Sequence, residues 1–358
     1  MPGRATAEKW LGEITSLPTA SGLESAVIEW VTRWVGRRSD LTITADSGGN
    51  LLVTQKGRKR RPPVVAVAHM DHPAFVVTAV QDGVVSFEFR GGVQPSYFAH
   101  ARIEFITGPG GWAHVSDYDP EARTGRIQVR GALPEVGDIG RWRFAGRKPE
   151  PGRMLAPAMD DLAGCAAALV ALDQVRGRSE FRHYGVLLTR AEEMGFVGAI
   201  HAAKNATIPE DARVLSIEAS RASAETPIGG GPVIRVGDAS SVFDNELTNA
   251  ISSAAAKDGI QYQRRLMSGG SCEATAFGGY GYRAAGLCLP LGNYHNMGNL
   301  DRVEHGRGAS IALKEEISLD DFHGLVRLIH LAIGAVDATG DFSARLDSIY
   351  RDGRHLLD

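Results

Sequence analysis

Histidine and carboxylate residues follow three apolar segments of the chain. The segments are VVAVA at 64–68, GVLLT at 185–189 and VLSI at 214–217, and each is typical of a buried strand. The polar residues after them are His69, Asp71, Glu192, Glu193 and Glu218. Ligands bind at the carboxyl ends of strands in open α/β sheets, so we expect these side chains to meet at one edge of a sheet.

Two further positions complete the set of candidate ligands. The acidic pair Asp160-Asp161 precedes an expected helix at 161–175, and Asp161 is suited to cap that helix. A second histidine must come from later in the chain. His295, in the glycine-rich loop LGNYHNMGN, is the best placed, and His305 is its competitor. We expect His323 and His330, which lie on the last predicted helix, to be structural.

Imidazole and carboxylate ligands without cysteine suit Zn²⁺, Co²⁺ or Mn²⁺ in a hydrolytic site. Two metals about 3.5–4 Å apart need one bridging carboxylate, together with a histidine and an acid on each metal. The side chains of Glu192 and Glu193 diverge because they are neighbours, so we expect one to be a ligand and the other a general base. The same divergence argues against a glycosidase, whose two carboxylates must flank one bond.

Composition narrows the class of protein. The chain has 358 residues, of which 43% are hydrophobic and 23% charged, and its net charge is −3, so neither disorder nor a nucleic-acid partner is indicated. A basic run at 56–61 is interpreted as a solvated turn. The three cysteines share no C-x-x-C spacing, and MPGRATAEKW contains no apolar h-region. We expect a cytoplasmic protein without a membrane partner.

The expected elements form one α/β domain with an insert. Ser21 and Glu24 have the spacing of a capping box and predict a helix over 21–36. Short strands without a helix fill about 75–152, as in a small β-barrel. Helices and strands alternate after Leu155 and end in a helix that begins near Ser318. This pattern predicts a mixed sheet with helices on both faces, carrying an inserted barrel.

The sequence resembles the co-catalytic di-zinc aminopeptidases of the glutamyl and deblocking type, some of which carry an endoglucanase label. The matching segments are collinear over nearly the whole chain, and include AHMDHPAFVVTAV at 68–80, AMDDLAGC at 158–165, TRAEEMGFVGA at 189–199 and SIEAS at 216–220. In this family a β-rich domain lies between the first metal histidine and the bridging aspartate. The domains implied are therefore a catalytic α/β domain of 1–74 and 153–358, and an insert of 75–152 serving oligomerisation or substrate access.

The resemblance implies a role for each candidate. Asp160 would bridge two divalent metal ions, expected to be Zn²⁺ with Co²⁺ or Mn²⁺ as alternatives. His69 and Glu218 would complete one metal site, and Glu193 and His295 the other. Glu192 would be the general base for the water between the metals. Asp71 would orient His69.

The function implied is an aminopeptidase that removes N-terminal residues from short peptides. Homo-oligomers from dimer to dodecamer are expected. One alternative is an acylamino-acid deacylase or dipeptidase of the same superfamily, and another is an inactive metal-binding or assembly protein. Three departures from the family pattern motivate the alternatives, namely Glu218 in place of Asp, His72 in place of an acid, and Ser271-Cys272-Glu273 in place of Thr-Asp. His72 is a candidate extra ligand, whereas Cys272 is expected to be a packing residue.

Overall fold

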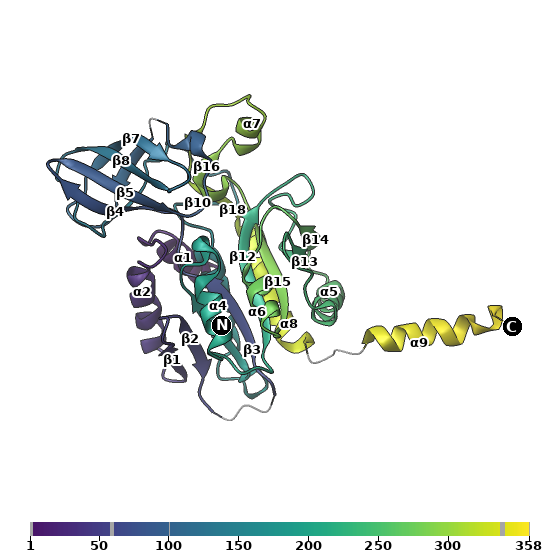
Figure 1. Cartoon of the computed structure of the whole chain (residues 1–358). Coiled ribbons are helices and arrows are strands. Elements are labelled where there is room, and N and C mark those ends of the chain that lie inside the picture. The colour runs from purple at the N-terminus through teal and green to yellow at the C-terminus, as the bar shows by residue number, and fades with distance from the viewer. Residues whose placement is uncertain (1–2, 58–60, 100, 337–340, 358) are drawn as a thin grey trace.

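A mixed eight-stranded sheet forms the centre of the computed structural model, which describes residues 3–57, 61–99, 101–336 and 341–357 (Figure 1). Residues 58–60 of the basic run at 56–61 therefore lie outside the described residues. The strands, in spatial order, are β1 (Leu41–Ala45), β2 (Leu51–Gln55), β11 (Tyr184–Thr189), β3 (Val64–His69), β12 (Arg213–Arg221), β15 (Arg283–Leu291), β13 (Val233–Asp238) and β14 (Gln263–Met267). The four central strands, β11, β3, β12 and β15, run parallel.

Helices cover both faces of this sheet. Successive side chains of a strand point to opposite faces, and in the buried strands both sets are apolar, so both faces must be covered. Val64 and Ala66 of β3 point to one face, and Val65 and Val67 point to the other. The first face is covered by α1 (Arg4–Ile14), α2 (Ser25–Gly36), α3 (Leu162–Val175), α5 (Asn245–Asp258) and α8 (Leu319–Ala335). The second is covered by α4 (Val197–Lys204) and α6 (Glu273–Gly279). The predicted α/β class is confirmed.

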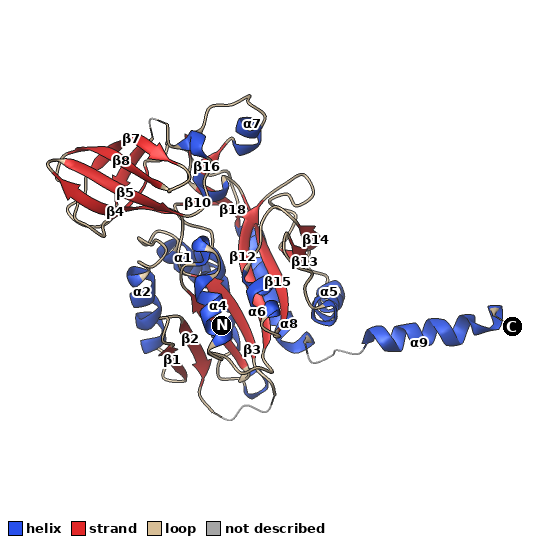
Figure 2. Ribbon diagram, in the orientation of Figure 1, coloured by secondary structure: helices blue, strands red, loops and turns tan. Residues whose placement is uncertain are grey.

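A closed antiparallel barrel follows β3 after four residues. Its strands are β4 (Ala74–Gln81), β5 (Val84–Arg90), β6 (Arg102–Phe105), β7 (Trp112–Asp119), β8 (Thr124–Arg130) and β9 (Ile139–Trp142), closed in the order β4-β5-β8-β7-β6-β9. Aromatic side chains fill its interior, and the rings of Phe75 and Trp142 lie 4.6 Å apart, edge to face. Figure 2 shows the barrel beyond one end of the main sheet.

Shorter elements complete the structure. The strand pairs are β10 (Arg153–Ala156) with β18 (Glu315–Ser318), and β16 (Met297–Gly298) with β17 (Ile311–Ala312). The remaining helical segments are η1 (Pro95–Tyr97), η2 (Ser179–Phe181), η3 (Glu192–Met194), η4 (Tyr294–Asn296), α7 (Leu300–Glu304), α9 (Asp341–Gly353) and η5 (Arg354–Leu356). Helix α9 extends away from the body (Figure 1). In the described part of the chain, no helix combines the length and apolarity needed to cross a bilayer.

Two details of the expected helices differ from the structure. Helix α1 precedes the first predicted helix. The capping box at 21–24 is wrong, because α2 begins at Ser25 and its N-cap residue, Glu24, makes no side-chain capping bond. Ser21 and Glu24 are instead buried and bond to the segments that carry the candidate site. The expected cap at Asp161 is confirmed, since its carboxylate accepts the N–H of Gly164 at 3.1 Å.

Candidate active site

The parallel strands bring three of the candidate positions to one edge. In the ladders, Thr189 of β11 lies beside His69 of β3, and Ser216 of β12 lies beside Val67. Glu192 and Glu193 follow β11 in η3, while Glu218 lies within β12. The left-handed backbone at Ala191 (φ 52°) turns η3 back toward this edge.

His69 stands at the centre of the first half of the cluster. Its Nε2 atom lies 3.3 Å from Asp160 Oδ1, 3.7 Å from Glu192 Oε2 and 3.8 Å from Glu218 Oε1. The imidazole is 1% exposed. Three carboxylates therefore surround one nitrogen in a region that water scarcely reaches.

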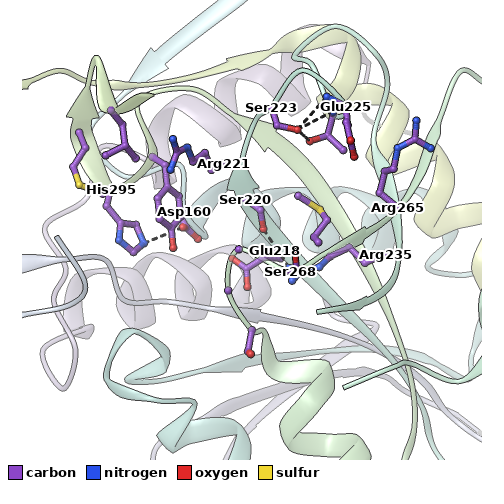
Figure 3. Close-up of a pocket in the computed structure, with 18 of the residues that line it drawn as sticks. Asp160, Glu218, Ser220, Arg221, Ser223, Glu225, Arg235, Arg265, Ser268 and His295 are labelled. Atoms are coloured by element: carbon purple, nitrogen blue, oxygen red, sulfur yellow. Dashed lines mark hydrogen bonds and ion pairs between the residues drawn. The ribbon is translucent and has the colours of Figure 1, made fainter. Parts of the chain in front are cut away.

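His295 completes the second half. Its Nε2 atom lies 3.1 Å from Glu193 Oε1 and 3.3 Å from Asp160 Oδ2, and Figure 3 shows His295 beside Asp160. Because the other Asp160 oxygen lies near His69, Asp160 stands between the two histidines. His305, the competing candidate, is exposed at the end of α7, where its Nδ1 lies 2.6 Å from the Asp301 carbonyl. The structure brings His295, not His305, to the cluster.

Both histidine rings are oriented through their Nδ1 atoms. Nδ1 of His295 lies 2.6 Å from the carbonyl oxygen of Gly92, which is an acceptor only. Nδ1 of His69 lies 3.2 Å from the carbonyl oxygen of Asp71. A proton on each Nδ1 leaves the Nε2 lone pair directed at the carboxylates, which is the tautomer that a metal-binding histidine needs.

The carboxylate of Asp71 holds η3 in place. It accepts the N–H groups of Glu192 at 3.0 Å and Glu193 at 3.1 Å, and the hydroxyl of Ser21 at 2.5 Å. Its Oδ1 atom is 3.5 Å from His69 Nδ1, farther than its own carbonyl oxygen. Asp71 therefore positions both glutamates as well as the neighbouring histidine.

Glu24 extends this support and was missed by sequence reasoning. Its side chain is fully buried, accepts the N–H of Ala191 at 3.1 Å and pairs with Arg190 Nε at 2.7 Å. Both Ser21 and Glu24 fall in the matched segment SGLES at 21–25, which was the available signal.

Burial and mutual repulsion dominate the electrostatics of the cluster. Burial raises the pKa of Glu218 to about 8, and the Asp160 carboxylate adds to the rise. Burial also raises the pKa of Glu192, with Glu218 and Glu193 adding to it and His69 opposing it. Burial alone would raise the pKa of Asp160, but the His295 and His69 imidazoles lower it. Burial would lower the pKa values of both histidines, yet the carboxylates raise them.

Unpaired buried oxygens test whether cations fit this cluster. Asp160 Oδ1 and Glu193 Oε1 are buried and accept no hydrogen bond from the described residues. Each nevertheless lies about as close to a histidine Nε2 as two ligands of one ion do. Ligand atoms of His69, Glu192 and Glu218, and of His69, Asp160 and Glu193, lie within 4.8 Å of one another. Where Nε2 carries no proton, a lone pair faces a lone pair at these distances. A cation between them removes the repulsion, so the residues fit divalent metals.

The departures from the family pattern have separate structural explanations. His72 places Nδ1 2.6 Å from the Asp160 carbonyl and Nε2 3.1 Å from Asn296 Oδ1. Both ring nitrogens thus face acceptors, so His72 is not an extra ligand. Cys272 is fully buried, and burial raises its pKa to about 12, which suits a packing residue. Glu273 lies beneath the cluster and accepts the hydroxyl of Thr189.

A pocket of about 490 Å³ opens beside the cluster. The cluster residues that line it are Asp160, Glu192, Glu193, Glu218 and His295. Figure 3 shows Asp160, Glu218 and His295 among the lining side chains. Three arginines, Arg221, Arg235 and Arg265, also line it. Arg221 pairs with Glu304 at 2.6 Å, but no carboxylate in the described chain lies within ion-pair distance of Arg235 or Arg265. The pocket combines a candidate metal centre with two arginines, Arg235 and Arg265, that make no direct ion pair in the described chain.

A buried cluster of histidines and carboxylates at the edge of a mixed sheet is typical of a metal-dependent hydrolase. The family model of the M42 glutamyl aminopeptidases matches residues 49–116 and 133–306, more than half of the chain. The chain belongs to the M42 glutamyl aminopeptidase family, as its sequence motifs predicted.

Individual relatives agree with this membership. A protein of Acetivibrio thermocellus with a provisional aminopeptidase name is 24% identical over 283 residues, covering 74% of this chain and 83% of its own. The structure of aminopeptidase APDkam598 from Desulfurococcus kamchatkensis is 23% identical, with a TM-score of 0.75 over 94% of this chain and 96% of that one. The structure of the TET1 peptidase of Pyrococcus horikoshii is 21% identical to this chain. Its TM-score is 0.74, and the match covers 91% of this chain and 98% of that one. The two structures share the fold of this chain.

Proposed function

We propose that the cluster is a dinuclear metal centre that hydrolyses the N-terminal peptide bond of short peptides. Asp160 would be shared by the two metals, His69 and Glu218 would hold one, and Glu193 and His295 would hold the other. The observation that carries this proposal is the position of Asp160, whose two oxygens each lie 3.3 Å from a different histidine Nε2. Zn²⁺ suits these nitrogen and oxygen ligands, with Co²⁺ or Mn²⁺ as alternatives.

Glu192 is the general base. It is the cluster carboxylate left over once each metal has a histidine, an acid and the shared aspartate. Burial raises its pKa, the direction that suits a general base. Two metals, when bound, would lower the pKa of a water and polarise the scissile carbonyl. Glu192 would accept a proton from that water and return it to the leaving amine. Asp71 keeps Glu192 in place through the N–H of η3.

Substitution of Glu192 by Gln tests this role. We expect kcat on aminoacyl chromogenic substrates to fall by about 10²- to 10⁴-fold while metal content stays at the wild-type level. Glu210→Gln, an exposed glutamate outside the cluster, is the matched control and should retain full activity. Full activity of the Glu192→Gln protein with metal bound would remove Glu192 from the mechanism.

Parallel assays separate the alternatives. Free-amine substrates should be cleaved and their N-acetylated counterparts should not. The opposite preference would indicate a deacylase, and bound metal without turnover on either substrate would indicate an inactive metal-binding protein.

We also propose a cytoplasmic homo-oligomer that assembles through the barrel, with the insert of 75–152 as the oligomerisation or substrate-access domain. The support is the TET1 relative, whose solved structures form a tetrahedron or a large octahedral shell. Light scattering of the purified protein should give a mass above the 38.3 kDa of one chain. A monomer at working concentration would contradict assembly.

A further inference from the structure

A buried glutamate outside the ligand set connects the segments that carry two of the proposed ligands. Glu315 is the first residue of β18 and is 0% exposed. The antiparallel pairing of β18 with β10 sets Glu315 opposite Ala156, four residues before Asp160. Its side chain therefore reaches the backbone that leads into the proposed bridging aspartate.

Both oxygens of the Glu315 carboxylate are used, and they bond to different segments. Oε2 accepts the N–H of Met159 at 2.6 Å and the N–H of Asp160 at 3.1 Å. Oε1 accepts the N–H of His295 at 2.8 Å. A carboxylate is suited to this place because it offers two acceptors and no donor, whereas an amide would turn an NH₂ group toward one of these N–H donors.

The loop that carries His295 needs such support. Asn293, His295, Asn296 and Asn299 all have positive φ, a region that residues with a side chain rarely occupy. A backbone of this kind persists only when its surroundings overdetermine it. Asn296 contributes by donating from Nδ2 to the Pro157 carbonyl at 2.9 Å, so the same two segments are tied a second time.

We propose that Glu315 is a positioning residue that sets the separation of Asp160 and His295 and thereby the affinity of the metal site that they share. Glu315 bonds to the backbone of both ligands and directs neither oxygen at the metal cluster. The inference rests on the ligand assignment proposed above. Because Asp160 serves both metals while His295 serves one, loss of Glu315 weakens the His295 site more than the His69 site.

Glu315→Gln tests the proposal, with Glu316→Gln as the control. Glu316 is the next residue of the same strand, points the opposite way and pairs with Arg147 at 2.7 Å. The metal-stripped proteins are titrated with Co²⁺ and followed by visible absorption. We expect Glu315→Gln to bind one equivalent with near wild-type affinity and the second about 10- to 100-fold more weakly, with an altered spectrum for that step. Excess metal should rescue kcat with little change in KM, and Glu316→Gln should behave as wild type.

The outcomes separate this proposal from the metal centre itself. Wild-type protein that binds no metal would contradict the dinuclear centre. Wild-type protein that binds two equivalents, with Glu315→Gln matching it in both steps, would overturn only the role of Glu315. If Glu315→Gln does not fold, Glu315→Asp replaces it. This variant keeps the charge but is too short to reach both segments, so it should lose affinity at the second step. Failure of both variants to fold would show that Glu315 serves folding, and would overturn the proposal.

Discussion

At the scale of single residues, backbone carbonyls set the tautomers of both candidate histidines. The carbonyl oxygen of Gly92 accepts from Nδ1 of His295, and that of Asp71 accepts from Nδ1 of His69. The two Nε2 atoms therefore face the same group of carboxylates. His295 was predictable from its loop after a buried strand. Glu315 was not, because a Glu-Glu pair ahead of a helix is typical of a solvated surface, and only its pairing with β10 places it against the Asp160 backbone.

The charges of the pocket lead to a prediction about substrates. Arg265 is exposed at the pocket wall without a carboxylate partner in the described chain, so it is free to attract an acidic side chain. Arg265→Gln should lower kcat/KM for a glutamyl substrate about fivefold, or about 1 kcal/mol, and leave that of a leucyl substrate unchanged. Arg264→Gln is the control, since Arg264 bonds to Asn249 instead. Equal losses on both substrates would rule out charge recognition by Arg265.

At the scale of elements, the short segment before α2 serves the site rather than the helix. Periodic valines predicted α2 correctly, because Val27, Val31 and Val35 are buried against the sheet. The Ser21 and Glu24 pattern was misread as a capping box, since local spacing does not reveal that both side chains bond to residues about 50 and 167 positions away. Long-range hydrogen bonds of this kind leave no periodic trace in a sequence.

Substitution of Glu24 measures what this segment contributes. Glu24→Gln removes the charge that pairs with Arg190 and weakens the bond to the Ala191 N–H, so η3 becomes less well held. We expect a loss of about 2 kcal/mol in unfolding free energy and a several-fold lower kcat. Denaturant unfolding and steady-state kinetics check both. Glu29→Gln, on the exposed face of α2, should change neither. An unchanged kcat for Glu24→Gln would separate this segment from the site.

At the scale of the whole molecule, the fold concentrates negative charge where the main sheet, the barrel connection and the last strand pair converge. The α/β class and the barrel followed from hydrophobic patterning, which reports burial directly. Carboxylates were expected at one sheet edge from the strand ends, but Glu315 was not among them, because burial of a charged residue depends on partners from distant elements. Asp160, Glu218, Glu273 and Glu315 are all less than one-tenth exposed.

This concentration predicts how the stability of the metal-free protein depends on pH. Burial raises the pKa of Glu218 to about 8 and those of Glu273 and Glu315 to about 7, all above the ordinary glutamate value of 4.5. A group whose pKa is higher in the folded than in the unfolded protein stabilises the fold fully at pH values below its unfolded-state pKa. That contribution is lost as the pH rises through the folded-state pKa. The raised pKa values of His69 and His295 act in the same direction.

The midpoint of thermal unfolding of the metal-free protein should therefore fall by several degrees between pH 5 and pH 8. Added Zn²⁺ should reverse the fall at pH 8, because it binds the ionised ligands of the folded state. Differential scanning calorimetry with and without chelator measures both effects. A metal-free protein that becomes more stable across this range would contradict the burial of these carboxylates.

The most direct test of the dinuclear centre is a titration of metal-stripped protein with Zn²⁺, in which bound metal and aminopeptidase activity are measured on the same samples. We expect activity to be absent without metal, to appear as metal binds and to reach its maximum at two equivalents per chain. His295→Ala should bind one equivalent at the same metal concentration and stay nearly inactive. Full activity of the stripped protein, or two tightly bound equivalents in His295→Ala, would contradict the proposed site.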